Sequence, residues 1–295
     1  MKKHAEVFIL LGQSNAVGHA IPMAEKDTIR QPLSHVFGLS RAQNQLLYPE
    51  RLYFSGYTSA GMNLGEAQDH TYSLANCLAA QWERAAEAVP GMPDLYLIQI
   101  AIGAQGIGPG FMWNPDYPEQ LTPGSLGTVN ISLYPFTKRI LSLLKPSFDQ
   151  MSVEYHILGV HWRGGEEDTA ANPPEIEIPL LQPIYRQLFD MLRLALGEMP
   201  KTVLYQIEYG TKIDERTDAD PELMQKNKTA INQMFYDFSR EYPAVSLFDP
   251  FSLSLYQPDH PKTWGIFSEE DGVHYSGAAN AEIAARIIEE WTIGR

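Results

Sequence analysis

Three polar residues near the two ends of the chain have the chemistry of a nucleophile, a general base and an orienting acid. Ser14 comes just after an apolar run, and Asp271 lies three positions before His274. Two intervening residues let the Asp and His side chains point the same way in a turn. A histidine can take the proton of a serine hydroxyl, while a carboxylate fixes the imidazole tautomer and stabilises the imidazolium. The pattern therefore indicates nucleophilic catalysis at Ser14.

Each motif also has a simpler structural explanation. A serine that follows a strand is often the N-cap of the next helix. An Asp-x-x-His stretch occurs in solvated loops as well. The N-terminus of a helix also suits a phosphate group, but Gly12–Ser14 lacks the glycine-rich loop and the lysine of a phosphate cradle. Taken singly, these motifs leave the alternatives open.

The rest of the chain predicts a scaffold that brings such residues together. Near-continuous apolar runs predict strands buried on both faces, at Val7–Leu11, Val36–Leu39, Leu95–Ile102, Val153–Trp162, Thr202–Ile207 and Val245–Phe248. Helical patterns lie between or after them, at Tyr72–Val89, Ile131–Leu144, Leu180–Leu196, Pro221–Tyr242 and Gly277–Trp291. This alternation predicts a parallel sheet with helices on both faces, joined by right-handed crossovers.

Three polar stretches directly follow strong strands of this predicted sheet. They are Gly12–Ser14, Gly103–Gln105 and Gly164–Glu166. Ligands of such folds bind outside the carboxyl ends of the strands, so we expect the three stretches to meet at one edge. The Asp271–His274 stretch comes just before the last helix and can fold over the same edge.

Together these motifs resemble the SGNH/GDSL hydrolase superfamily. Gly12–Ala16 reads Gly-Gln-Ser-Asn-Ala, and Asp271–Ser276 reads Asp-Gly-Val-His-Tyr-Ser. More narrowly, the chain is similar to the sialate O-acetylesterase and acetylxylan esterase-like group of carbohydrate esterases. Trp162–Asp168 matches most positions of that group's Trp-x-Gln-Gly-Glu-x-Asp block, and Ile102–Ile107 resembles its Gly-Gly-Thr block. The resemblance spans nearly the whole chain in the right order.

The resemblance implies a fold and a mechanism. It implies a flavodoxin-like, three-layer α/β/α sandwich with a central parallel sheet of about five strands. We expect one domain over residues 1–295, with long loops at about 20–65 and 106–130. The resemblance implies Ser14 as nucleophile, His274 as base and Asp271 as its orienter, with an acyl-enzyme that water hydrolyses. An α/β-hydrolase fits less well, because its Asp and His are far apart in sequence.

The chain departs from the family where the oxyanion would bind. Gly164 stands where the family has a Gln whose amide donates to the oxyanion, and Ala104 replaces a Gly. The backbone N–H groups of Ser14 and of the Gly103–Ala104 region are the expected donors. Loss of one donor typically costs about 10²- to 10³-fold in kcat. An alternative is therefore a catalytically impaired SGNH-fold protein that binds carbohydrate.

Four further residues complete the candidate oxyanion and substrate-binding site, namely Gln13, Gln105, Arg163 and Glu166. By position, Gln105 and Arg163 are candidate replacement donors. We expect Glu166 to support the site loop through hydrogen bonds. The alternatives for Glu166–Asp168 are a glycosidase acid pair or a metal site with His161, and both are disfavoured. His19 and Trp113 are placed where they can line the pocket, without an assigned role.

Composition narrows the partners. The net charge of −14 disfavours nucleic acid, and the single cysteine, Cys77, reads as a buried small residue. The apolar run Val7–Leu11 is too short for a signal peptide, and no run reaches membrane-spanning length. We therefore expect a cytoplasmic protein with no cofactor, no metal and no membrane partner, acting on a small-molecule or oligosaccharide ester.

Overall fold

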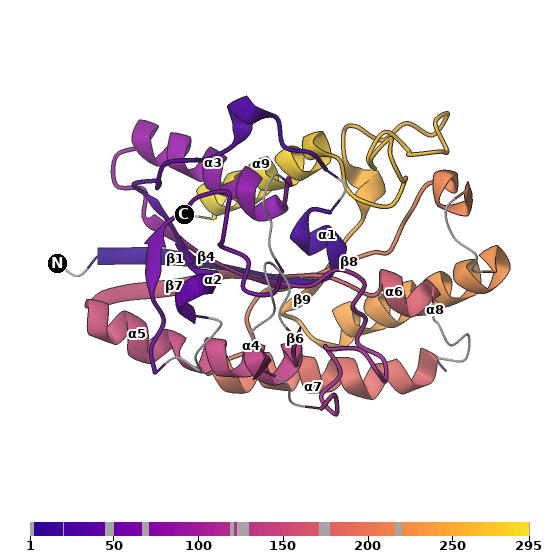
Figure 1. Cartoon of the computed structure of the whole chain (residues 1–295), viewed down its shortest axis with the longest axis horizontal. Coiled ribbons are helices and arrows are strands. Elements are labelled where there is room, and N and C mark those ends of the chain that lie inside the picture. Colours follow the sequence, from indigo (N-terminus) through magenta and orange to yellow (C-terminus); the bar gives the residue numbers. More distant parts are fainter. Residues whose placement is uncertain are drawn as a thin grey trace.

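The computed structural model describes residues 3–19, 21–44, 50–66, 71–118, 121–122, 130–170, 178–215 and 220–294 (Figure 1). Its strands are β1 (Lys3–Gly12), β2 (Val36–Leu39), β3 (Phe54–Gly56), β4 (Asp94–Ala101), β5 (Leu121–Thr122), β6 (Asn130–Ile131), β7 (Val153–Arg163), β8 (Thr202–Tyr205) and β9 (Val245–Phe248). Its α-helices are α1 (Ser14–Val17), α2 (Arg41–Asn44), α3 (Leu74–Ala88), α4 (Leu133–Ser142), α5 (Leu144–Met151), α6 (Glu166–Ala170), α7 (Ile178–Leu196), α8 (Pro221–Glu241) and α9 (Gly277–Ile293). Short 3₁₀ turns are η1 (Glu25–Asp27), η2 (Thr211–Glu215) and η3 (Pro250–Ser252).

The predicted parallel sheet is confirmed, with more strands than expected. In the described part of the chain it has seven strands rather than about five, in the order β3-β2-β4-β1-β7-β8-β9. All neighbours pair in parallel except β3, which is antiparallel to β2. β3 was not predicted, because three half-buried residues carry too little hydrophobic pattern. β5 and β6 form a separate antiparallel pair.

β1 is central because its side chains serve two cores. Residues Val7–Leu11 are all fully buried. Val7, Ile9 and Leu11 pack into one core, while Phe8 and Leu10 pack into the other. The alternation follows the two-residue period of a strand, so an unbroken apolar run is the sequence that this place requires.

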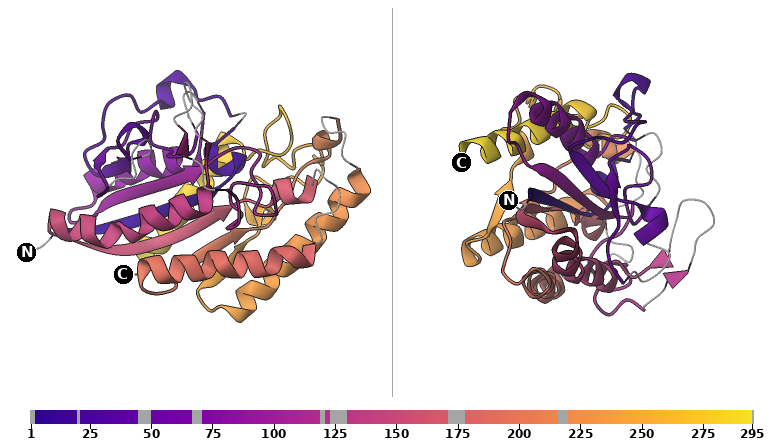
Figure 2. Two further views of the ribbon diagram at one scale, coloured as in Figure 1. Left: turned by 60° about the horizontal axis from the view of Figure 1, so that its bottom comes forward. Right: turned by 90° about the vertical axis from the view of Figure 1, so that its left-hand side faces the viewer.

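Helices cover both faces of the sheet. In Figure 1, α3 and α9 lie on one side of the sheet, and α4, α5, α7 and α8 lie on the other. Figure 2 shows the same three layers from two further directions. The helices start where capping predicts. The side chains of Ser73 and Ser276 accept hydrogen bonds from the first turns of α3 and α9, and Asp220 does so for α8.

The structure contains a helix that the sequence did not predict, because the predicted helix ended at Leu144. The pattern Ile131–Leu144 becomes α4, and a further helix, α5, begins at Leu144 instead of the chain breaking at Pro146. Pro146 is tolerated because it lies in the first turn, where a backbone N–H has no partner within the helix. No helix in the described ranges is long and apolar enough to cross a bilayer.

Of the two long loops, the described part of 20–65 contains β2, at the strand predicted for Val36–Leu39, and also η1, α2 and β3, which were not predicted. The described part of 106–130 has no helix. Residues 20, 45–49, 119–120 and 123–129 of these loops lie outside the described residues.

Candidate active site

The three polar stretches that follow strong strands lie side by side at the carboxyl edge of the sheet. Gly12, at the end of β1, pairs with Ala101 of β4 on one side and with Arg163 of β7 on the other. Gly12 has a φ of 141°, and a Cβ there would lie 1.9 Å from the Arg163 carbonyl oxygen. Glycine is therefore required for β1 to turn into α1, which begins at Ser14.

Asp271 and His274 form a dyad in the loop between η3 and α9. The Nδ1 atom of His274 is 2.6 Å from Oδ2 of Asp271. The Oδ1 atom of Asp271 accepts the backbone N–H groups of Val273, at 2.9 Å, and of His274, at 3.0 Å. Burial alone would raise the pKa of Asp271, but the hydrogen bonds from His274 and the backbone hold this pKa below its ordinary value. Asp271 is therefore a carboxylate that accepts from Nδ1–H, which leaves Nε2 of His274 as the basic nitrogen.

Asn15 ties this dyad to the residue next to Ser14. Its Nδ2 atom donates to the Val273 carbonyl at 3.2 Å, and its Oδ1 atom accepts from the Tyr275 N–H at 2.9 Å. These contacts fix the backbone on both sides of His274 against the first turn of α1. Asn15 is 3% exposed. The two motifs, about 260 residues apart in sequence, therefore share one site, and the sequence reading gave Asn15 no role.

Glu166, which follows β7, and Gln13, which follows β1, support the same turn. The Oε1 atom of Glu166 accepts from Nδ2 of Asn15 at 2.7 Å, as expected of a residue that supports the site loop. Gln13 is 2% exposed, and its Oε1 atom accepts the Glu167 N–H at 3.4 Å. Gln13 is therefore part of the frame of the site rather than its surface.

Asp168 anchors the loop that follows β4. It is fully buried and accepts the N–H groups of Ile107 and Gly108 at 2.9 to 3.2 Å. Burial raises the pKa of Asp168 to about 6 despite these hydrogen bonds. Within the described ranges no three His, Cys, Asp or Glu residues form a group that could hold a metal ion.

The expected oxyanion donors differ in whether another group of the protein already occupies them. The N–H of Gly103 donates to Oε2 of Glu66 at 2.8 Å, so it is already occupied. Ala104 is exposed and has a φ of 53°. The Oε1 atom of Gln105 accepts the Met112 N–H at 3.0 Å, which ties this side chain to its own loop. The N–H of Ser14 lies in the first turn of α1, where such groups have no partner within the helix.

Arg163 lies beneath the site rather than facing it. The side chain is 1% exposed. Its Nη1 atom donates to Oδ1 of Asn280 at 2.6 Å and to the Asn15 carbonyl at 3.3 Å. The guanidinium carbon lies 4.4 Å and 4.6 Å from the ring centres of Tyr205 and Tyr275. Arg163 is thus a buried support that joins α1 to α9, and this position does not suit a donor to substrate.

A second histidine–carboxylate pair borders the site. The Nε2 atom of His19 lies 3.0 Å and 3.1 Å from the two carboxylate oxygens of Glu66. The rings of His19 and His274 have centroids 6.2 Å apart. The sequence offered His19 as a pocket residue without a role, and it gave no signal for Glu66, which is 47 positions away. Trp113 is fully buried and donates to the Gly12 carbonyl, so it belongs to the core and not to a pocket wall.

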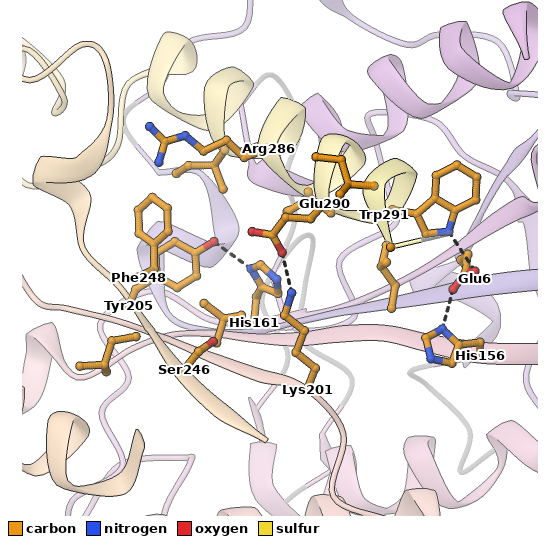
Figure 3. A pocket seen from close by; sticks show the side chains of 17 residues that line it. Glu6, His156, His161, Lys201, Tyr205, Ser246, Phe248, Arg286, Glu290 and Trp291 are labelled. Carbon is orange, nitrogen blue, oxygen red and sulfur yellow. Dashed lines mark hydrogen bonds and ion pairs between the residues drawn. The ribbon is translucent and has the colours of Figure 1, made fainter. Parts of the chain in front are cut away.

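A cavity of about 730 Å³ lies elsewhere, between α9 and strands β7–β9 (Figure 3). None of Ser14, Asp271 and His274 lines it. His161 points into it and bonds the Tyr205 hydroxyl at 2.8 Å. Burial, with Arg163 and Lys201 nearby, lowers the pKa of His161 well below its ordinary value. The Asp271–His274 dyad therefore lies outside this cavity.

Comparison with known proteins places the fold. The chain matches no protein-family model and no curated protein sequence. It superimposes on the crystal structure of NanS over 99% of this chain and 98% of that one, with a TM-score of 0.60 and 13% identity. An X-ray structure of an Arabidopsis thaliana protein matches with a TM-score of 0.53 and 15% identity, over 96% and 98% of the two chains. A carbohydrate acetylesterase from Xanthomonas citri matches with a TM-score of 0.50 and 11% identity, over 95% of this chain and 54% of that one. The chain therefore shares its three-layer α/β/α fold with these proteins.

Proposed function

We propose that this protein is a serine esterase that removes acetyl or other short acyl groups, with Ser14 as nucleophile, His274 as base and Asp271 as its orienter. The observation that carries the proposal is the set of hydrogen bonds made by Asn15. They hold the His274 backbone against the turn that begins at Ser14, while Asp271 fixes the His274 tautomer at 2.6 Å. A nucleophile, a base and an orienter in this order are the parts that acyl transfer requires.

The reaction proceeds in two steps. The Ser14 hydroxyl oxygen attacks the ester carbonyl carbon as its proton moves to Nε2 of His274. The tetrahedral intermediate collapses, the bond to the alcohol oxygen breaks, and the alcohol leaves with the proton from His274. Water then attacks the acyl carbonyl carbon as its proton moves to His274. The bond to the Ser14 oxygen breaks, the acid leaves, and His274 returns the proton to the Ser14 hydroxyl. Asp271 stays ionised and stabilises the imidazolium in both steps.

The substrate class is proposed to be a carbohydrate ester. One structure with this fold is a carbohydrate acetylesterase, and the motifs of the chain resemble those of carbohydrate esterases. An acetyl group is small enough to need no large acyl pocket, and the described cavity of about 730 Å³ is not lined by the triad.

A second candidate function is carbohydrate binding without turnover. Two observations favour it: the Gly103 N–H is occupied by Glu66, and Gly164 has no side chain to donate. Loss of oxyanion donors lowers kcat without removing the binding surface.

Hydrolysis of p-nitrophenyl acetate by the wild type and by Ser14→Ala tests the proposal. We expect turnover by the wild type and loss of nearly all of it in Ser14→Ala, after which acetylated sugars are screened. Covalent labelling of Ser14 by a fluorophosphonate, read by intact mass, provides a second readout that does not depend on the sugar. A wild type that is inert toward both reagents but binds sugars would refute the esterase and support the second candidate.

A further inference from the structure

The oxyanion of the proposed reaction needs donors that the family pattern no longer supplies here. Gly164 provides no side chain, and Arg163 is buried beneath the site with its guanidinium against two tyrosine rings. The Gly103 N–H points to Glu66. Of the donors expected from sequence, the Ser14 N–H is the one best placed. A tetrahedral intermediate is stabilised best by two or more donors.

His19 lies where a further donor is needed. Its backbone N–H bonds the Ser14 carbonyl at 3.1 Å, so the end of α1 fixes it relative to the nucleophile. A Cβ at Gly103 would lie 2.5 Å from Nε2 of His19, which shows that the ring packs directly against the loop that follows β4. The ring centroids of His19 and His274 are 6.2 Å apart, a separation that one small functional group can bridge with a hydrogen bond to each ring.

The charge state suits donation. The hydrogen bond from His19 to Glu66 raises the pKa of His19, against the opposing effect of burial. Burial would raise the pKa of Glu66, but the bonds from His19 and Gly103 lower it, and Arg41 acts in the same direction. Both shifts favour a His19 imidazolium paired with a Glu66 carboxylate. Glu66 accepts from Nε2, which leaves Nδ1–H as the free donor of a side chain that is 38% exposed.

We propose that His19, oriented by Glu66, donates a hydrogen bond from Nδ1 to the carbonyl oxygen of the ester as it becomes the oxyanion. His19 donates this hydrogen bond without losing its proton, so its Nδ1–H bond does not break. The proton that is transferred during the reaction moves through His274. His19 is then a catalytic residue, and Glu66 is a positioning residue that acts through it. This inference rests on the proposed esterase function.

The test compares His19→Ala, His19→Gln and Glu66→Gln with the wild type. The control is His260→Ala, since His260 is exposed and lies in the loop after η3. The readouts are kcat and KM for p-nitrophenyl acetate and the rate of Ser14 labelling by a fluorophosphonate. We expect His19→Ala to lower kcat and the labelling rate by about 10²-fold with little change in KM. His19→Gln keeps an N–H donor and should recover part of the loss, while His260→Ala behaves as wild type.

A pH profile separates donation from a purely structural role. The donor is present when His19 is protonated, so kcat of the wild type should fall on the alkaline side as His19 loses its proton. That fall should be absent in His19→Gln and should move to lower pH in Glu66→Gln. The titratable and charged groups near the pair are Arg41, which lowers the pKa of Glu66, and His274, whose ring centroid lies 6.2 Å from that of His19.

Two results would overturn the inference in different ways. Suppose that the wild type is active and that His19→Ala leaves kcat and the labelling rate unchanged, or raises only KM. This result refutes the role of His19 and leaves the esterase proposal standing. An inert wild type whose Ser14 resists the fluorophosphonate refutes the esterase itself and this inference with it. Thermal melts of each variant distinguish loss of folding from loss of chemistry.

Discussion

The side chain of Asn15 links three segments of the candidate site through hydrogen bonds. Its side-chain NH₂ group donates to Glu166 and to the Val273 carbonyl, and its side-chain oxygen accepts from the Tyr275 N–H. The bond from Tyr275 is buried and the other two are partly buried, while Asn15 itself is 3% exposed. Buried polar groups of this kind are costly to leave without partners. The placement of the His274 backbone against the first turn of α1 therefore depends on Asn15.

Asn15→Ala should remove the hydrogen bonds that link the first turn of α1 to the backbone around His274. It leaves a carboxylate and two backbone groups without their partner, so we expect the free energy of unfolding to fall by about 2 to 4 kcal/mol and esterase kcat to fall as His274 drifts. Urea unfolding and p-nitrophenyl acetate hydrolysis measure the two effects. Asn15→Asp is the matched control, because it still accepts from Tyr275 but meets Glu166 as a second carboxylate. Full activity in either variant would show that the dyad is held by other contacts.

At the level of elements, the site is assembled by short connections between strands and helices. β1 ends at a glycine so that α1 can start at once, and β7 leads into α6 through Gly165. The loop after β4 contributes Gly103 and is held by Asp168 of α6. The loop after β4 is thus fixed by the helix that follows β7, which holds this part of the sheet edge in place.

The carboxyl group of Asp168 should make the stability of the protein depend on pH. Its folded pKa of about 6 lies above that of an unfolded aspartate, so the folded state holds this proton more tightly. The stabilising contribution is fully present below the unfolded pKa, near pH 4, and is lost as pH rises through about 6. From the size of the shift we expect a fall of up to about 3 kcal/mol over this interval.

Urea unfolding between about pH 4 and pH 7 of the wild type and of Asp168→Asn measures this contribution. The difference between the two proteins should change with pH in the stated direction, since the amide of the variant cannot titrate and every other group is shared. A difference that stays constant, or grows in the opposite direction, would show that the hydrogen bonds from Ile107 and Gly108 hold Asp168 ionised.

For the whole molecule, the sequence predicts best what depends on repeated patterns. The strands of the parallel sheet follow from apolar runs, and the meeting of Gly12–Ser14 with Gly164–Glu166 follows from parallel topology. β3 was missed because an edge strand of three residues has no such pattern. The burial of Arg163 was missed because charged side chains are ordinarily exposed, and only the fold brings the rings of Tyr205 and Tyr275 against its guanidinium. The contact of His19 with Glu66 is likewise a product of the fold.

The sheet joins two hydrophobic cores, and β1 tests whether they unfold as one unit. Leu10 and Leu11 are adjacent, equal in size and fully buried, but Leu10 packs into the core under α3 and α9 while Leu11 packs into the core under α4, α5, α7 and α8. Leu10→Ala and Leu11→Ala should each lower the free energy of unfolding by about 2 to 5 kcal/mol. Each variant serves as the control for the other.

Because both cores share β1, we expect the cavity left by either substitution to destabilise the helices on both faces of the sheet equally. Hydrogen exchange read by mass spectrometry should show α3 and α7 losing their protection together in both variants, with a single urea transition. Loss of protection in α7 alone for Leu11→Ala, or in α3 alone for Leu10→Ala, would mean that the layers unfold separately. In that case the sheet would be a boundary between two cooperative units, and the site at its carboxyl edge would lie where they meet.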